Sequence, residues 1–378
     1  MTEKIHVGVI FGGRSSEHEV AVRSARAVIE ALDTEKYTVI PVAITKDGHW
    51  LSPANAAAML PDETRRLLPA EATGMDEASV AIIGDPSHQG LTTIDGDGDG
   101  RLPQTLDVVF PVLHGPYGED GTIQGLLEMA GIPYVGSGVL GSACGMDKVT
   151  MKALFVHAGL PVCKYTWFRR AEWERDRESV TQRIEQQIGY PCFVKPANLG
   201  SSVGISKATD RASLAASINL AARYDRKILV EEAVDAREIE CAIIGNDEPE
   251  ASLPGEYVVH DKQAEFLDYT EKYSNTGHVE FVVPAPVPEE LVGQIQEMAK
   301  QAFKAVDGAG LARVDFFLQR ATNELLISEI NTMPGLTEVS GYPKLWAGTG
   351  LAFPQVVERL IELAFARHQD KARNETTL

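Results

Sequence analysis

Residues 311–319 read LARVDFFLQ and residues 325–331 read LLISEIN, and these two segments decide the fold of the C-terminal part of the chain. Each is a short run rich in apolar, β-branched and aromatic residues, which is typical of a β-strand. The residues between them, 320–324, read RATNE and are mostly polar, as expected of a turn. The stretch therefore predicts a β-hairpin.

Alternation along this hairpin gathers polar side chains on one face. If the turn centres on Thr322, Asp315 lies opposite Glu329, and Arg313 lies opposite Asn331. Because successive side chains of a strand point to opposite faces, all four polar side chains project from the same face. The other face is the predicted core side and carries Val314, Phe316, Leu318, Leu326 and Ile330.

Two carboxylates directly opposite each other, Asp315 and Glu329, destabilise a hairpin unless something compensates their charge. A hard cation would compensate. Carboxylate and amide oxygens without cysteine or histidine suit Mg²⁺ or Mn²⁺, which also bind phosphate oxygens. The alternative is an exposed polar face on which Arg313 serves as the counter-ion, and the residues alone leave both interpretations open.

Other segments carry groups suited to a phosphorylated ligand. Lys148 begins a predicted helix, and Lys195 ends the apolar run CFVK. Residues 198–204, NLGSSVG, form a loop of small residues whose donors could fold over phosphates. Residues 231–238, EEAVDARE, join two predicted strands, where a carboxylate could bind ribose hydroxyls and the backbone could contact adenine. Taken singly, such features are more often solvated lysines and ordinary loops.

The composition argues against several classes of partner and site. The 378 residues include 35 basic and 54 acidic side chains, and the net charge of −19 disfavours nucleic acid and membrane partners. The 4 cysteines are scattered without a C-x-x-C pair, so we expect no zinc site and no disulfide framework, in keeping with a reducing cytosol. We also expect no secretory signal and no membrane span, since no apolar run approaches roughly 18 residues.

The length predicts two or three domains. Residues 5–44 read as strand, glycine loop, helix and strand, which is typical of a parallel α/β domain. We expect an N-terminal α/β domain over 1–142, a central subdomain over 143–227 and a C-terminal subdomain over 228–378. Residues 61–105 have the weakest pattern, and we expect an elaborated surface excursion there.

Two glycine-rich segments resemble known ligand-binding loops but fail a further test. Residues 95–100, DGDGDG, resemble the start of a calcium-binding EF-hand loop, yet the twelfth position, Leu106, lacks the required acid. Residues 136–141, GSGVLG, match a dinucleotide-binding pattern, yet residues 157–161 lack the acid expected about 20 residues later. We therefore expect a solvated acidic turn and a tight turn leading into the next domain.

Taken together, the segments resemble the D-alanine–D-alanine ligase family of the ATP-grasp superfamily. Each is weak or moderate alone, but they occur in the family's order, and the ordered set is highly specific. Gly341 stands where some relatives carry a larger residue. The matching segments are FGGRSSEHEV (11–20), HGPYGEDGT (114–122), MDK (146–148), VKPANLGSSVG (194–204), EKY (271–273), RVD (313–315) and EINTMPGLT (329–337), with Ser340.

The resemblance implies an α/β and α+β protein with the ATP-grasp fold and an N-terminal Rossmann-like domain. The N-terminal domain would help to bind the substrates, and two α+β subdomains would clamp ATP between their sheets. The implied reaction joins two D-alanine molecules into the dipeptide used for peptidoglycan. ATP would phosphorylate the carboxylate of the first D-alanine, and the amine of the second would attack the acyl phosphate.

The resemblance also implies which residues bind ATP and metal. Two Mg²⁺ ions, for which Mn²⁺ is a possible substitute, would be bound by Asp315, Glu329 and Asn331. The nucleotide would be held by Lys148, Lys195, Ser202, Glu231, Glu232, Val234, Glu238 and Lys272.

A further set of residues would contact the two D-alanines. Arg313 and the Gly335 N–H would stabilise the tetrahedral oxyanion. Ser340 would hold the second carboxylate, and His114, oriented by Glu119, would assist with the second amine's proton. Glu17 would hold the ammonium of the first D-alanine. Ser201 and Tyr273 would complete a hydrogen-bonded triad with Glu17, which ties two loops together over the site.

Two alternatives to this function remain at the level of sequence. One is another ATP-grasp carboxylate–amine ligase with a different product. The other is a regulator that binds a nucleotide or amino acid without turnover, whose hallmark would be the loss of Arg313 or of a metal ligand. The resemblance further implies a cytoplasmic location and a homodimer, without nucleic acid or membrane partners.

Overall fold

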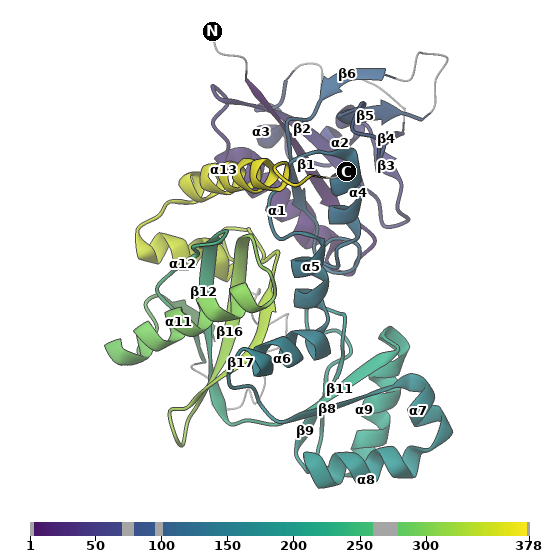
Figure 1. The fold of residues 1–378 in the computed structure, drawn as a ribbon, viewed down its shortest axis with the longest axis vertical. Helices are drawn as coiled ribbons and strands as arrows, with labels where there is room; N and C mark the ends of the chain where they lie inside the picture. The colour runs from purple at the N-terminus through teal and green to yellow at the C-terminus, as the bar shows by residue number, and fades with distance from the viewer. Residues whose placement is uncertain (1–3, 70–78, 95–100, 260–278, 376–378) are drawn as a thin grey trace.

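The fold is known from a computed structural model that describes residues 4–69, 79–94, 101–259 and 279–375. Three main β-sheets follow one another along the chain, each accompanied by helices (Figure 1). The mixed α/β and α+β architecture confirms the predicted fold class. The predicted acidic turn at 95–100 lies outside the described residues.

A mostly parallel sheet forms the N-terminal domain, as the strand–helix–strand pattern predicts. Its order is β3-β2-β1-β7, with β1, β2 and β7 parallel and β3 antiparallel at the edge. Most residues of the central strands are buried on both faces, as expected for a parallel sheet between helices. The elements are β1 (Ile5–Gly12), α1 (His18–Ala31), β2 (Tyr37–Ile44), β3 (Trp50–Leu51), α2 (Pro53–Ala58), β7 (Val108–Val112), α4 (Thr122–Ala130) and α5 (Val139–Met146).

The described parts of residues 61–105 are largely exposed, as expected of a surface excursion, but their short strands also add side chains to the core of this domain. Val80, Ile82 and Leu91 are buried in one apolar cluster with Ile40 of β2 and Leu127 of α4. The strands are too short for a periodic pattern to stand out in the sequence. They form an antiparallel sheet of β4 (Val80–Ile82), β5 (Gly90–Thr93) and β6 (Arg101–Thr105), preceded by α3 (Asp62–Arg65).

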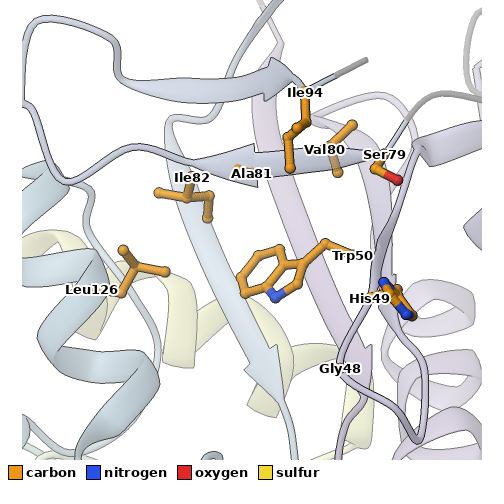
Figure 2. Close-up of a pocket in the computed structure, with 9 residues that line it drawn as sticks. All are labelled: Gly48, His49, Trp50, Ser79, Val80, Ala81, Ile82, Ile94 and Leu126. Atoms are coloured by element: carbon orange, nitrogen blue, oxygen red, sulfur yellow. The ribbon is translucent and has the colours of Figure 1, made fainter.

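A pocket of about 400 Å³ lies beside this small sheet. Figure 2 shows the indole ring of Trp50 pointing into the hollow, together with Ile82 and Leu126. The pocket contains none of the residues that the sequence predicts to bind ATP or substrate, and we assign no ligand to it.

An antiparallel sheet in the order β10-β9-β11-β8 forms the central subdomain. The predicted boundary after residue 227 is misplaced, because β11 pairs with β8 and β9 as far as Glu232. Residues of α8 and α9 pack on the sheet in one apolar cluster. The elements are β8 (Tyr165–Arg169), α7 (Arg170–Arg175), α8 (Arg177–Gln187), β9 (Cys192–Pro196), β10 (Ser206–Ala208), α9 (Arg211–Tyr224) and β11 (Lys227–Glu232).

The C-terminal sheet has the order β15-β14-β12-β16-β17, with β13 beside β12. All of its pairings are antiparallel. The elements are β12 (Ala236–Gly245), β13 (Glu250–Ala251), β14 (Gly255–Val259), β15 (Val279–Val282), α11 (Glu289–Ala305), β16 (Gly310–Gln319), β17 (Leu325–Asn331), α12 (Gly341–Thr349) and α13 (Phe353–Lys371).

The hairpin of β16 and β17 has the predicted register at its polar end. Arg313 pairs with Asn331, and Asp315 pairs with Glu329. The register then shifts by one residue between Asp315 and Phe316, so Phe316 pairs with Ile327 and Ser328 is the extra residue of a β-bulge. Because of the bulge, the fully buried side chain is Ile327, whereas the predicted core residue Leu326 is only half-buried.

Two helices connect the sheets. α6 (Lys148–His157) places Met151 and Phe155 in the core of the C-terminal sheet, although the sequence analysis assigns it to the central subdomain. α13 returns to the N-terminal domain (Figure 1), where the Arg367 guanidinium stacks 4.1 Å from the Tyr134 ring centre and donates to the Tyr134 carbonyl. The N-terminal and C-terminal sheets thus contribute to one shared apolar cluster.

Residues 136–138 form a bend that runs directly into α5, whereas the sequence predicts a tight turn over 136–141, and the segment packs against the start of the C-terminal hairpin. Ser137 Oγ accepts from the Ala309 N–H at 3.1 Å. A Cβ atom at Gly141 would lie 2.3 Å from the Asp307 carbonyl oxygen, so the backbone approaches too closely for any other residue. The glycines serve this close packing.

All four cysteines are free thiols in the structure. Among the helices that the structure describes, none is both long and apolar enough to cross a membrane.

Candidate active site

Three loops from different parts of the chain meet at Glu17, which immediately precedes α1. Its Oε2 atom lies 3.0 Å from where a Cβ of Gly115 would stand and 2.9 Å from that of Gly200. Ser201 Oγ donates a hydrogen bond to Glu17 Oε1. The structure therefore brings together Glu17, the 114–122 loop and the 198–204 loop, which the sequence predicts to surround one site.

The 198–204 loop is held in an unusual backbone conformation. Ser201 and Ser202 have φ angles of +53° and +56°, in the left-handed region that non-glycine residues rarely adopt. Such strain persists only where surrounding contacts impose it, and it concentrates at functional sites. Here the Lys148 ammonium donates to the Leu199 carbonyl at 3.0 Å and Ser201 binds Glu17, so both sides of the loop are tied down.

Two of the predicted phosphate-binding lysines lie in this region, and both are paired with acids. Lys148 Nζ lies 3.2 Å from Glu329 Oε2, and Lys195 Nζ lies 2.6 Å from Glu231 Oε2. Burial alone would raise the pKa of Glu329, but the positive charges of Lys148, Lys195 and Arg313 lower it to about 2. Glu329 is therefore an anion at neutral pH, available to a cation.

Glu231 is predicted to help hold the nucleotide, and its carboxylate lies between two lysines. Glu231 is 3% exposed, and its two oxygens pair with Lys152 at 2.8 Å and Lys195 at 2.6 Å. The Glu232 carboxylate accepts from the Lys164 N–H at 2.8 Å at the edge of the sheet. Val234 and Glu238 are half-buried at the connection from β11 to β12, and their predicted contact with nucleotide stays a prediction.

The polar face of the hairpin is a network of ion pairs. Arg313 donates from Nε and Nη2 to the two oxygens of Asp315, each at 2.7 Å, and Asn331 Nδ2 donates to Asp315 Oδ2 at 3.1 Å. On its other side, Arg313 Nε lies 3.4 Å from Glu240 Oε2. The facing acids of the hairpin thus have separate counter-ions, Arg313 for Asp315 and Lys148 for Glu329.

The oxygens of Asp315, Glu329 and Asn331 are a suitable donor set for a hard divalent cation. The parts of the chain that the structure describes hold no group of three or more His, Cys, Asp and Glu side chains placed to bind a metal. A cation here would therefore need further ligands, and the phosphate oxygens of ATP are of the right kind.

His114 is held by partners that the sequence analysis missed. Its Nδ1 bonds the Met333 carbonyl at 3.0 Å, and its Nε2 bonds Ser24 Oγ at 3.2 Å. Burial lowers the pKa of His114, which favours the neutral ring. Glu119 accepts from the Gly115 N–H at 2.7 Å, so the prediction that it orients His114 directly is wrong.

Glu119 is the acid most perturbed by this environment. Its burial, together with the nearby negative charge of Glu17, raises the pKa of Glu119 to about 8. A negative charge beside a carboxyl group disfavours its ionised form. The sequence contains no pattern that would place Ser24 at the site. Lys152 could have been found, because it follows Lys148 by four residues and therefore lies on the same face of the helix.

The segment after the hairpin carries the remaining predicted residues. Gly335 is half-buried, and Ser340 is buried at the start of α12 with its hydroxyl 2.7 Å from Thr337 Oγ1. At Gly341, a Cβ atom would lie 2.2 Å from Glu240 Oε2. The Glu240 carboxylate thus occupies the space of a side chain at this position, which explains the glycine. Lys272 and Tyr273 lie outside the described residues.

Replacing Ser201 with alanine is expected to lower kcat/KM at least about tenfold, because a hydrogen bond to a carboxylate is worth roughly 1.5–3 kcal/mol. Steady-state kinetics and thermal unfolding measure the effect and the fold. Ser206→Ala is the matched control, since the Ser206 hydroxyl, just after the loop, has no hydrogen-bond partner among the described residues. Equal kinetics for the two variants would remove Ser201 from the site.

Two family models cover most of the chain. Residues 6–137 match the model described as the D-ala D-ala ligase N-terminus, and residues 154–362 match the D-ala D-ala ligase C-terminus. Among similar sequences, the D-alanine–D-alanine ligase of Natranaerobius thermophilus is 48% identical over 99% of this chain and 98% of its own length. That of Heliobacterium modesticaldum is also 48% identical, over 98% and 97%.

Solved structures show the same similarity. The D-alanine–D-alanine ligase of Coxiella burnetii superposes with a TM-score of 0.80 at 34% identity, covering 98% of each chain. The VanG D-Ala:D-Ser ligase of Enterococcus faecalis superposes with a TM-score of 0.81 at 37% identity, covering 96% of this chain and all of its own. The similarity thus extends through all three sheets.

Proposed function

Because the chain belongs to the D-alanine–D-alanine ligase family, we propose that the site around Glu17, Arg313 and Glu329 joins two D-alanines at the expense of ATP. Members of this family use ATP and a divalent metal ion, and their dipeptide product serves peptidoglycan synthesis. One observation carries the assignment to this site. The acidic hairpin face, Lys148 and the Glu17–Ser201 contact all belong to one chain of contacts that links the three sheets.

ATP would lie between the central and C-terminal sheets, with its phosphates toward Lys148 and Lys195. Asp315, Glu329 and Asn331 would hold two Mg²⁺ ions, or Mn²⁺ in their place, together with phosphate oxygens. The metal supplies neutralisation of charge on the transferring phosphoryl group. Lys148 would exchange its ion pair with Glu329 for the phosphates. Lys272 would lie near the transferred group, and Ser202 and the 231–238 segment would contact the nucleotide.

The chain's own residues would then orient the two substrates. Glu17 would bind the ammonium of the first D-alanine. The hydrogen bond from Ser201 holds the Glu17 carboxylate in place, and Tyr273 would be the third member of the triad. The 198–204 loop would exclude water, which matters because an acyl phosphate hydrolyses readily. Ser340 would bind the carboxylate of the second D-alanine.

Attack by the second amine creates a tetrahedral oxyanion. Arg313 and the Gly335 N–H would stabilise it, since preorganised donors at such a centre are a large source of catalysis. The neutral His114 ring donates from Nδ1 to Met333 when Nε2 accepts from Ser24, so help from His114 with the proton of the second amine would pass through the Ser24 hydroxyl. We also propose a cytoplasmic location, where ATP is available, and a homodimer.

The direct test is turnover by the purified chain. With ATP, Mg²⁺ and D-alanine, it is expected to release one ADP and one phosphate for each D-alanyl-D-alanine formed. L-alanine should give no turnover above the blank. Arms with D-serine and D-lactate in competition with D-alanine test the second substrate. Absence of dipeptide with every D-amino acid, or a preference for D-serine or D-lactate, would contradict the proposed function.

A further inference from the structure

A lysine that the reaction does not use lies fully buried behind the site. Lys152, on α6, is 1% exposed, and its ammonium has three partners. It lies 2.8 Å from Glu231 Oε1, donates to the Ser328 carbonyl at 3.0 Å, and lies 3.7 Å from Cys163 Sγ. An ammonium has three N–H donors, so all of them are used. A buried lysine so fully bonded is fixed in position and in charge.

The Ser328 contact explains how the lysine is fixed relative to the hairpin. Ser328 is the extra residue of the β-bulge, and an extra residue is left out of the regular hydrogen-bond ladder. The next residue, Glu329, pairs with Lys148 from the preceding turn of the same helix. Lys148 and Lys152 therefore attach one face of α6 to the strand that carries the acidic site.

The Glu231 contact matters for charge. One carboxylate oxygen binds Lys152 and the other binds Lys195, at 2.8 and 2.6 Å. Burial alone would raise the pKa of Glu231, but the two lysines lower it to about 2, so the group is an anion. The three side chains together carry one net positive charge. Without Lys152, the Glu231 anion would belong to Lys195 alone, and that pair would be neutral.

We propose that Lys152 is a positioning residue for nucleotide binding: by sharing the Glu231 carboxylate, it keeps a net positive charge at Lys195 for the phosphates of ATP. Lys152 need not touch the nucleotide, since it lies behind Glu231. The inference rests on the proposed function, in which Lys195 faces ATP. It also gives the buried acid at 231 a role that needs no direct contact with the nucleotide.

The test is a charge series measured by two affinities. Dissociation constants for Mg²⁺-ATP and for adenosine are determined by calorimetry on the full chain, and their ratio reports phosphate binding alone. In wild type and in the double variant Lys152→Met/Glu231→Gln, the side chains at positions 152, 195 and 231 together carry one net positive charge. These three side chains carry no net charge in Lys152→Met and two positive charges in Glu231→Gln. Lys152→Arg keeps the charge and is the conservative control, with thermal unfolding to confirm that each variant is folded.

The preference for ATP over adenosine is expected to fall about tenfold or more in Lys152→Met, because contacts to a charged group are worth more than neutral ones. It should return most of the way in the double variant, stay near wild type in Lys152→Arg, and rise in Glu231→Gln. If Lys152→Met does not fold, Glu231→Gln and the double variant still differ by one charge and must differ in the ratio. Ratios that do not follow the charge overturn the inference. A wild type that binds ATP no better than adenosine would instead contradict the proposed function.

Discussion

Replacing Glu329 with glutamine is expected to lower kcat at least about a hundredfold, since a metal ion at a phosphoryl group contributes several kcal/mol. Glu329 is half-buried with a pKa of about 2, so the substitution removes a full negative charge and not a protonated acid. The amide keeps the size of the side chain. It binds a hard cation less tightly and no longer neutralises Lys148. Kinetics at varied Mg²⁺ should show a raised requirement for Mg²⁺ together with the lower kcat.

Glu256→Gln is the matched control for this substitution. Glu256 lies in the same sheet, and it pairs with Arg237 at 2.5 Å away from the acidic hairpin face. Both variants lose one partly buried ion pair, so both should lose stability. Only Glu329→Gln should lose turnover. Wild-type turnover of Glu329→Gln at limiting Mg²⁺ would exclude Glu329 from the metal site.

Arg313→Lys is expected to lower kcat by roughly a hundred- to a thousandfold, the range seen when one oxyanion donor is removed. Arg313 holds both oxygens of Asp315 through a planar fork and lies 3.4 Å from Glu240 on its other side. A lysine keeps the positive charge but cannot reproduce the fork. The free energy of unfolding should therefore change less in Arg313→Lys than in Arg313→Met, while both variants lose turnover.

Comparison of the two Arg313 variants separates catalysis from structure. Arg313→Met leaves the Asp315 and Glu240 carboxylates facing each other without their cation, and loss of one partner from a buried ion pair is strongly destabilising. Urea unfolding and ADP release measure the two effects independently. Full turnover in Arg313→Lys would show that positive charge is sufficient and that the fork is not needed at the oxyanion.

The polar register of the β16–β17 hairpin could be predicted because a short turn and a period of two leave few choices. The bulge at Ser328 could not, since one extra residue near the turn leaves both strands apolar and alternating. Because of the bulge, the core residue of this strand is Ile327 and not the predicted Leu326. The predicted pairing of Asp315 with Glu329 is correct because these residues lie on the far side of the bulge from the turn.

Site residues could be predicted where they belong to a sequence motif, but the buried contacts that support them could not. Glu17, Lys148 and Ser201 belong to ordered motifs, and the structure brings them together. Glu231 lies in a motif, but its carboxylate is buried between Lys152 and Lys195. Its partner Lys152 comes from a helix that packs on the other sheet. A single sequence does not contain that tertiary contact.

The central claim is that ATP activates the first D-alanine as an acyl phosphate, and transfer of a carboxyl oxygen tests it most directly. D-alanine carrying ¹⁸O in both carboxyl oxygens is supplied with ATP and Mg²⁺, and the phosphate released is analysed by mass spectrometry. Attack of a carboxylate oxygen on the γ-phosphorus leaves that oxygen in the phosphate when the peptide bond forms. We predict one ¹⁸O atom in phosphate for each dipeptide. Unlabelled phosphate, or label in AMP with release of pyrophosphate, would contradict the account.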